Sequence, residues 1–355
     1  MSPSLRSIGL LFTLVLLWTT ALQAQPITYT ITDLGPVITV DAIAPDGSMI
    51  TSSQLVSGEQ TAFLVRPTST NLGYLPQGVF SKANGVNSTT VVGYAGTGRF
   101  SLFTHAFVWT AATGMHDLGT TGTDDLFSAA IGINGAGTIV GHGDAPDRSR
   151  LVPLVWMAGT VSILPTLSTG DATAVAINEQ GDITGWAATG DGHTHAVLWP
   201  IDGGLVDLDP AATPLSFAFG LNSARQVVGF EITPQGTRGF VWAPDTGIVP
   251  LPPLPGDMVS YATAINDTGT IVGRSVFLGP TADQVVLRAV RWDQGVAVEL
   301  LPLVRHHRGW TLTNATGISE DGSIVGVGML HGEQHGYLLT PRASRRHRMD
   351  RVAQR

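Results

Sequence analysis

Two groups of histidines are the most direct candidates for chemistry in this chain of 355 residues. His331 and His335 are separated by Gly-Glu-Gln, while His306 and His307 are adjacent. Imidazole nitrogens suit Zn²⁺ and Cu²⁺, so convergence of the two groups on one transition metal is one interpretation. A metalloprotease motif, however, needs a helix in which Glu directly follows the first histidine. The pattern here predicts a loop between strands, and we expect no metal site.

Loop carboxylates are the second candidates. Asp144, Asp147 and Asp191 could supply Ca²⁺ ligands or an acid pair for glycoside cleavage, but no spacing rule pairs them. The chain has no G-x-S-x-G nucleophile turn and no phosphate-binding Walker loop. It also has no cysteine, which excludes thiolate zinc sites, iron–sulfur clusters and cysteine catalysis. We therefore expect no catalytic residue and no cofactor.

A repeat of about 44 residues must position these side chains. Each repeat contains up to three short recurring motifs, here called the first, second and third phrases. The first phrase is typified by GINGAGTIVG around Asn134. The phrase recurs around Asn87, Asn178, Asn222, Asn266 and Ser319, with a weaker first copy in which Pro45 occupies the Asn position. A second phrase, such as HAFVW at 105–109, and a third, such as HDLGT at 116–120, follow each copy except the last, which lacks the third. A third phrase, TDLGP at 32–36, instead precedes the first copy.

Each phrase is typical of a short strand, because β-branched and aromatic residues dominate it and Asn-x-x-Gly or Asp-Gly turns follow the first strand. Four strands in about 44 residues is the size of one β-propeller blade. We predict an all-β propeller of seven four-stranded blades, in which an N-terminal strand at 29–34 closes the last blade. A β-solenoid is the alternative, but it would not need this displaced strand. We expect the repeated tryptophans to pack between blades: Trp109, Trp156, Trp199, Trp242 and Trp292.

These phrases resemble the bacterial HAF family of extracellular repeats, named for a His-Ala-Phe tripeptide. The resemblance rests on HAFVW at 105–109, HAVLW at 195–199, HDLGT at 116–120 and the repeated Ile-Asn hairpin, and it covers about residues 27–341. Only His105-Ala106-Phe107 matches the tripeptide literally. The resemblance implies an exported bacterial repeat protein and brings no catalytic residues with it. From the residues alone, we expect the repeated histidines to form structural hydrogen bonds.

The two ends of the chain differ from the repeats. A cationic start, an apolar run from Ile8 and a small residue at Ala24 predict a signal peptide at 1–24, with no transmembrane segment in the mature chain. An N-terminal membrane anchor is the alternative, but the apolar run is short for a bilayer span. Residues 342–355 contain six arginines and one acid, which predicts a disordered, solvated basic tail; an electrostatic tether to an anionic surface is the alternative. Residues 25–341 would form the propeller. The net charge of −8 argues against nucleic-acid binding.

Ligand-binding residues are expected in the longer loops, because function on a repeat scaffold lies outside its repeated core. The second-to-third and fourth-to-first connections project from one face, here called the long-loop face. For the aromatic residues near the channel mouth, ordinary packing is the favoured role, and stacking on a sugar or a peptide side chain is the alternative. The candidates are Arg99, Phe127, His142, Asp144, Arg148, His193, Tyr261, His306, His307, Trp310, His331 and His335.

The function expected from the sequence is a monomeric, non-enzymatic binding or interaction scaffold, secreted or periplasmic. It would hold a protein or glycan on the long-loop face. The alternative is a polysaccharide hydrolase or lyase whose acidic residues converge from different blades at the channel mouth.

Overall fold

The computed structural model describes residues 27–66, 68–98, 103–122, 126–209, 214–281 and 284–342. The predicted signal peptide and the predicted tail from residue 343 onward lie outside these residues. Strands dominate the described chain, and a short 3-10 helix, η2 (Leu301–Leu303), precedes the last blade. No helix among the described residues is long and apolar enough to cross a bilayer.

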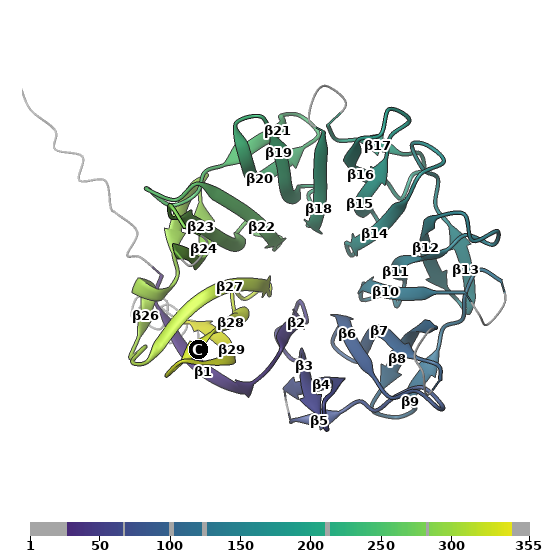
Figure 1. Cartoon of the computed structure of the whole chain (residues 1–355), viewed down its shortest axis with the longest axis horizontal. Coiled ribbons are helices and arrows are strands. Elements are labelled where there is room, and N and C mark those ends of the chain that lie inside the picture. The colour runs from purple at the N-terminus through teal and green to yellow at the C-terminus, as the bar shows by residue number, and fades with distance from the viewer. Residues whose placement is uncertain are drawn as a thin grey trace, which may run out of the picture.

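The strands form seven blades around a central axis, and the first strand of each blade lies innermost (Figure 1). Blades 1 to 3 comprise β2 (Thr39–Ile43), β3 (Ile50–Val56), β4 (Glu59–Arg66) and β5 (Thr70–Asn71); β6 (Ser81–Val86), β7 (Thr90–Gly96), β8 (Thr104–Thr110) and β9 (Gly114–Asp117); and β10 (Ser128–Ile133), β11 (Ile139–Asp144), β12 (Leu151–Met157) and β13 (Thr160–Ile163).

Blades 4 to 6 repeat this order. They comprise β14 (Ala172–Ile177), β15 (Ile183–Ala188), β16 (Thr194–Trp199) and β17 (Val206–Asp207); β18 (Leu215–Leu221), β19 (Val227–Thr233), β20 (Gly236–Ala243) and β21 (Gly247–Leu251); and β22 (Val259–Ile265), β23 (Ile271–Leu278), β24 (Val285–Asp293) and β25 (Val296–Glu299). A parallel bridge between Thr194 and Leu215 joins blades 4 and 5.

Blade 7 combines the two ends of the described chain. Its first three strands are β27 (Trp310–Ile318), β28 (Ile324–Leu330) and β29 (Glu333–Pro341). The fourth and outermost long strand is β1 (Tyr29–Pro36), which pairs antiparallel with β29. The two-residue β26 (Val304–Arg305) pairs parallel with β1. Figure 1 shows purple β1 beside the yellow strands of blade 7. This confirms the predicted seven-bladed propeller and its closure by the N-terminal strand.

Apolar clusters fill the spaces between neighbouring blades, and there are seven of them among the described residues. The cluster at the closure contains Val40 and Ile50 of blade 1 with Val325 and Leu338 of blade 7. Burial of apolar surface therefore continues around the whole ring, including the interface where the chain begins and ends.

The repeated tryptophans contribute to these clusters, as the sequence predicted. Trp109, Trp156, Trp199 and Trp292 are buried in four of them, while the half-buried Trp242 packs against a fifth. Two of the indoles also donate to the preceding blade. Trp199 Nε1 lies 2.8 Å from the Pro165 carbonyl oxygen, and Trp292 Nε1 lies 2.8 Å from that of Pro252.

The turn after the inner strand carries a second inter-blade link in blades 2 to 6. The Asn side-chain amide donates to the main-chain oxygen at the same position of the next blade, over 3.0–3.2 Å, while its own oxygen accepts N–H groups of its turn. The donors are Asn87, Asn134, Asn178, Asn222 and Asn266. In blade 1 the register puts Ala44 at this position, so the prediction of Pro45 was wrong by one residue.

A β-bulge follows from the register of every inner strand. In blade 3, for example, Ala130 pairs with Gly141 and Gly132 pairs with Val140, so Ile131 has no partner in β11. The same shift occurs in the other six inner strands. An extra residue of this kind leaves the ladder and redirects its side chain.

Candidate binding channel

A cavity of about 750 Å³ lies on the axis of the ring and is lined by the inner strands of all seven blades. Every bulge contributes one side chain to its lining: Asp41, Asn84, Ile131, Val175, Phe219, Thr263 and Thr316. Two residues further along, each inner strand adds an aliphatic side chain: Ile43, Val86, Ile133, Ile177, Leu221, Ile265 and Ile318. These strands end in the tight turns, so the cavity becomes apolar toward the tight-turn face.

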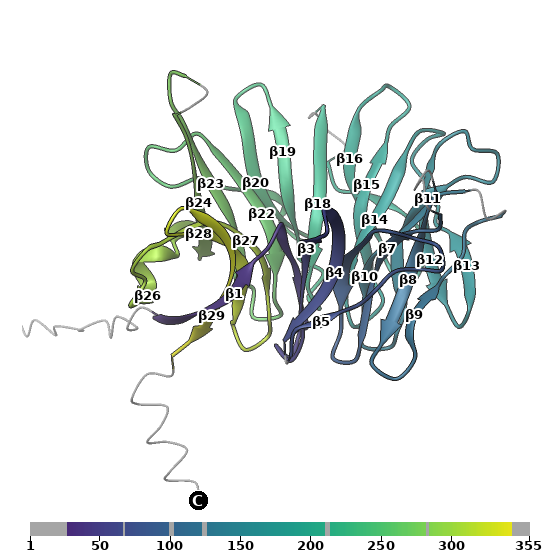
Figure 2. The same ribbon diagram turned by 60° about the horizontal axis from the view of Figure 1, so that its bottom comes forward.

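The opposite half of the cavity lies nearer the long-loop face. Inner strands begin there, and the β19–β20 connection rises on that side of the ring (Figure 2). Phe230, Tyr261 and Arg274 line this half of the cavity, on strands β19, β22 and β23.

An arc of aromatic rings connects blades 4, 5 and 6. Trp186 lies edge-on to Phe217 with centroids 5.8 Å apart, and Phe217 stacks on Phe230 at 5.2 Å. Phe230 also lies 5.7 Å from Phe219 and 4.9 Å from Tyr261. Such offset and edge-on pairs hold rings in fixed positions. Three members of the arc, Phe219, Phe230 and Tyr261, line the cavity itself.

Arg274 continues this arc as a cation. Its Cζ lies 4.4 Å from the centroid of the Tyr261 ring, within the range of a cation–π contact. Its buried Nε has no hydrogen-bond partner among the described residues. The cavity therefore has a positive charge whose position is fixed by an aromatic ring.

Asp41 contributes a carboxylate on blade 1. The hydroxyls of Thr39 and Ser53 donate to its two oxygens, over 2.5 and 2.7 Å. Burial raises the pKa of Asp41 to about 6, although these hydrogen bonds and the charge of Lys82 act in the opposite direction. The carboxyl consequently changes its charge near pH 6.

Polarity is divided around the cavity. The bulge residues of blades 3, 4 and 5 are Ile131, Val175 and Phe219, whereas those of blades 6, 7, 1 and 2 are polar. One side of the axis can therefore contact an apolar surface while the other offers charged and hydrogen-bonding groups.

The structure brings several predicted site residues together in blade 3. The ring centroids of Phe127 and His142 are 5.4 Å apart, and Asp144 Oδ2 accepts the Phe127 N–H over 2.9 Å. Burial lowers the pKa of His142 to about 4, and its Nδ1 is buried with no partner among the described residues. Of the predicted residues, however, Tyr261 alone belongs to the described lining of the axial cavity.

Three other predicted residues lie together in blade 7. Trp310 is buried in an inter-blade cluster, and its ring lies edge-on to that of His335 at 6.2 Å. The exposed His331 packs its imidazole against Gly309. None of the three belongs to the described lining of the cavity.

The remaining predicted residues are dispersed. Arg148, His306 and His307 are exposed in loops, and His193 is half-exposed with its Nδ1 3.5 Å from Asp191. Arg99 lies outside the described residues. Across the part of the chain that is described, no group of three or more His, Asp or Glu side chains could hold a metal ion.

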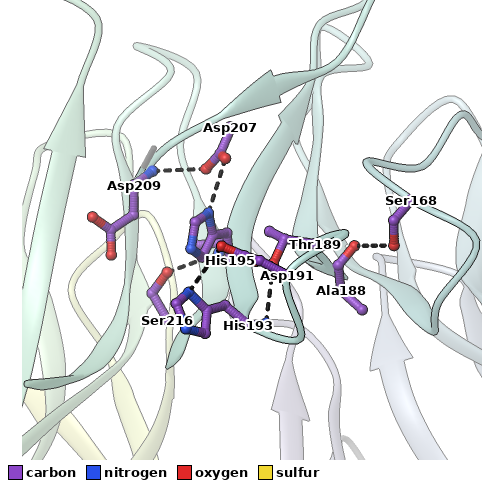
Figure 3. A network of polar contacts seen from close by, with 10 residues as sticks. Ser168, Ala188, Thr189, Asp191, His193, His195, Asp207, Asp209 and Ser216 are labelled. Atoms are coloured by element: carbon purple, nitrogen blue, oxygen red, sulfur yellow. Dashed lines mark hydrogen bonds and ion pairs between the residues drawn. The ribbon is translucent and has the colours of Figure 1, made fainter. Parts of the chain in front are cut away.

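The repeated histidines form hydrogen bonds to the aspartate carboxylates of the third phrase. His Nδ1 lies 2.7–2.9 Å from an aspartate of the next strand in three pairs: His105–Asp117, His195–Asp207 and His335–Asp33. Figure 3 shows the pair in blade 4, where Asp207 also accepts the Asp209 N–H. Because Asp33 belongs to β1, the third pair crosses the ring closure. These contacts agree with the structural role expected for these histidines.

Sequence reasoning missed most of the cavity. Asp41, Phe219, Phe230 and Arg274 line it but were not among the candidates. Two signals could have found them: the third residue before each turn Asn, which is the bulge, and the residue directly after the repeated Gly of the second strand, as in Gly229-Phe230 and Gly273-Arg274.

Comparison with known proteins identifies the fold and nothing narrower. No family model matches this chain, and no curated protein matches it. An oligogalacturonate lyase from Vibrio parahaemolyticus has a similar structure, with 12% identity over 87% of this chain and 93% of that one, at a TM-score of 0.54. The β-propeller domain of the Trilobed protease from Pyrococcus furiosus, described as having an open velcro topology, gives 8% identity over 88% and 93% at 0.50. TolB from Acinetobacter baumannii gives 10% identity over 62% of each chain at 0.43. The fold and cavity thus define a seven-bladed β-propeller with an axial pocket.

Proposed function

We propose that this chain is an exported binding protein of the HAF-repeat type, which holds a ligand at the long-loop face and in the axial cavity without transforming it. One observation carries the proposal. The polar and aromatic side chains that recur from blade to blade form framework contacts, while the bulge side chains that face the cavity differ among the blades.

The cavity has the properties of a ligand site. Its volume of about 750 Å³ falls within the usual range for small-molecule pockets, and its lining is largely apolar with a few polar groups. A glycan end or a peptide side chain would fit this combination, since both present a flat apolar face and hydrogen-bonding groups. Export to the periplasm or beyond is supported by the signal-peptide pattern of residues 1–24.

The test is a glycan and peptide array probed with the mature protein, with two variants of blade 4 as probes of the site. Val175→Trp would fill the cavity, whereas Val206→Trp adds the same bulk on the exposed outer strand. We expect saturable binding that Val175→Trp abolishes and Val206→Trp preserves. Binding that survives Val175→Trp would remove the cavity from the proposal.

A polysaccharide-cleaving enzyme is the second candidate, favoured by Asp41. A carboxyl with a pKa near 6 in a partly apolar cavity is suited to proton transfer. Because an oligogalacturonate lyase has a similar fold, polygalacturonate is the first substrate to test. Incubation with polygalacturonate and other polysaccharides, followed by product detection, separates the two functions. Turnover that Asp41→Asn abolishes would overturn binding without catalysis.

A further inference from the structure

We propose that the axial cavity recognises an organic carboxylate, with Arg274 holding the carboxylate and the aromatic arc contacting a flat apolar face of the same ligand. This inference rests on the proposed function, because it names the chemistry of the ligand that the cavity binds.

The absence of an acidic partner for Arg274 is the first support. Across the described residues, Arg274 forms no hydrogen bond or ion pair, although the chain has 27 acidic and only 19 basic residues. Three other partly buried arginines are paired with aspartates: Arg225 with Asp182, Arg288 with Asp257, and Arg291 with Asp293. Two more, Arg150 and Arg238, donate to main-chain or hydroxyl oxygens. A partly buried guanidinium whose N–H donors have no acceptor is strongly stabilised when an anion binds to it.

The position of Arg274 is the second support. It follows Gly273 in β23 and pairs in register with Tyr261 of β22, and both residues line the cavity. The Tyr261 ring 4.4 Å from Cζ covers one face of the guanidinium. A planar guanidinium held in this way presents a fixed fork that matches the two oxygens of a carboxylate.

The negative charge in the cavity, the Asp41 carboxylate, favours a cationic ligand less than Arg274 favours an anionic one. Both carboxylate oxygens of Asp41 already accept hydrogen bonds, from the hydroxyls of Thr39 and Ser53. The positive charge of Lys82, the single lysine of the chain, also stabilises the ionised form of Asp41. Asp41 therefore has partners within the protein, whereas Arg274 does not. This difference selects an anion over a cation.

The rest of the ligand is defined by the rings beside Arg274. Phe230 lies 4.9 Å from Tyr261, and Phe219 lies 5.7 Å from Phe230, so ring surface extends directly from the cation into the cavity. A sugar acid and an aromatic acid share the required chemistry, a carboxylate attached to a body with a flat apolar face. These are the two sources that the experiment separates.

The experiment measures calorimetric affinities of two matched pairs of probes for the full mature chain. The pairs are trigalacturonate with its neutral counterpart galactotriose, and 3-phenylpropionate with 3-phenylpropionamide. We expect one carboxylate to bind at least about 10-fold more tightly than its neutral partner. Tighter trigalacturonate binding would identify the sugar acid as the source, and tighter phenylpropionate binding the aromatic acid.

Arg274→Gln tests the residue, and Arg305→Gln, at an exposed position of β26, is the matched control. We expect Arg274→Gln to remove the preference for the carboxylate and to change the thermal midpoint little, because it breaks no hydrogen bond or ion pair among the described residues and loses only the contact with the Tyr261 ring. Arg305→Gln should bind as the wild type does. The inference is overturned if each carboxylate binds no better than its neutral partner, if neither carboxylate binds at millimolar concentration, or if Arg274→Gln retains the preference.

These outcomes are distinct from failure of the proposed function. Neutral probes or array glycans that bind, and that Val175→Trp excludes, would keep the binding function and reject the carboxylate. An array without any binding, together with calorimetry without any binding, would reject both.

Discussion

Two positions only three residues apart in each repeat behave in opposite ways. Asn occupies the turn position in blades 2 to 6, where it links each blade to the next. The bulge position, such as Ile131 before Asn134, has the same backbone register shift in every blade, yet its side chains range from Asp41 to Phe219.

The physical reason lies in what each position must satisfy. A buried turn leaves N–H and C=O groups that need partners, and Asn can serve its own turn and the neighbouring blade at once. A bulge residue has left the ladder, so the ring makes no comparable demand on its side chain. The comparison indicates that repeated residues hold this ring together and varied residues define its cavity.

The largest expected effect follows from breaking the framework at its closure. Deleting residues 25–36 would remove β1, expose the edge of β29 and eliminate the buried Tyr29, whose hydroxyl accepts a hydrogen bond from Arg291 over 2.9 Å. We expect a loss of at least about 5 kcal/mol in the free energy of unfolding, together with self-association through the exposed edge. Chemical denaturation and sedimentation would measure these effects.

A separate peptide spanning residues 27–37 should restore part of the lost stability to the truncated chain, since it would rebuild the outer strand. Thr30→Ala, at an exposed position of β1, is the control and should change little. An unfolding midpoint unaffected by the deletion would show that β1 does not hold the ring closed.

The framework could be predicted because it repeats. The orphan TDLGP phrase placed β1 in blade 7, where Asp33 now pairs with His335, and the repeated Trp position marked the inter-blade clusters. The position in the weak first copy was wrong by one residue, because Ala44 replaces the Asn and the turn there is one residue longer than in blade 3, with Ile43 paired to Ile50.

The cavity could not be predicted to the same extent, because the bulge residues that line it share no type. Loop length directed attention to His306 and His331, but the lining comes from the inner strands, where bulges redirect side chains such as Asp41 toward the axis. A bulge depends on the register between two strands. The period of the sequence does not report it, and this is why Tyr261 was the one predicted residue found in the described lining.

A single framework residue should have the next largest effect. Asn178→Ala would remove hydrogen bonds to the Asn222 oxygen at 3.1 Å and from the Asp182 N–H at 2.8 Å, and leave both of these groups buried without that partner. We expect a loss of about 2–4 kcal/mol in the free energy of unfolding, measured by chemical denaturation. Asn178→Ser should lose less, since the serine at this position in blade 7, Ser319, donates a hydrogen bond within its own turn, to the Ser323 oxygen. Equal stability of the wild type and Asn178→Ala would mean that the turn position is not a structural link.

The smallest expected effect has the opposite sign and belongs to the cavity. Burial raises the pKa of Asp41 to about 6, whereas an unfolded aspartate titrates near 4. Between these values the folded protein binds more protons than the unfolded chain, so the contribution of Asp41 to stability falls as the pH rises from about 4 to about 6. Asp41→Asn should remove this cost. We expect it to match the wild type near pH 4 and to exceed its stability at pH 8 by up to about 2–3 kcal/mol, the equivalent of the difference between the two pKa values.

The control for this prediction is Asp46→Asn in the same blade. Hydrogen bonds from the Ser48 hydroxyl and N–H lower the pKa of the exposed Asp46, so its replacement should cause a small loss of stability at pH 8 rather than a gain. Denaturation midpoints of both variants and the wild type, taken from pH 4 to pH 8, provide the measurement. A constant difference between Asp41→Asn and the wild type over this range would mean that the cavity carboxylate carries no such cost. A gain in stability for Asp41→Asn, together with a loss for Asn178→Ala, would instead show that the two residues have different roles. Asn178 would stabilise the ring, whereas Asp41 would lower its stability. A charge retained at the expense of stability points to a role in binding.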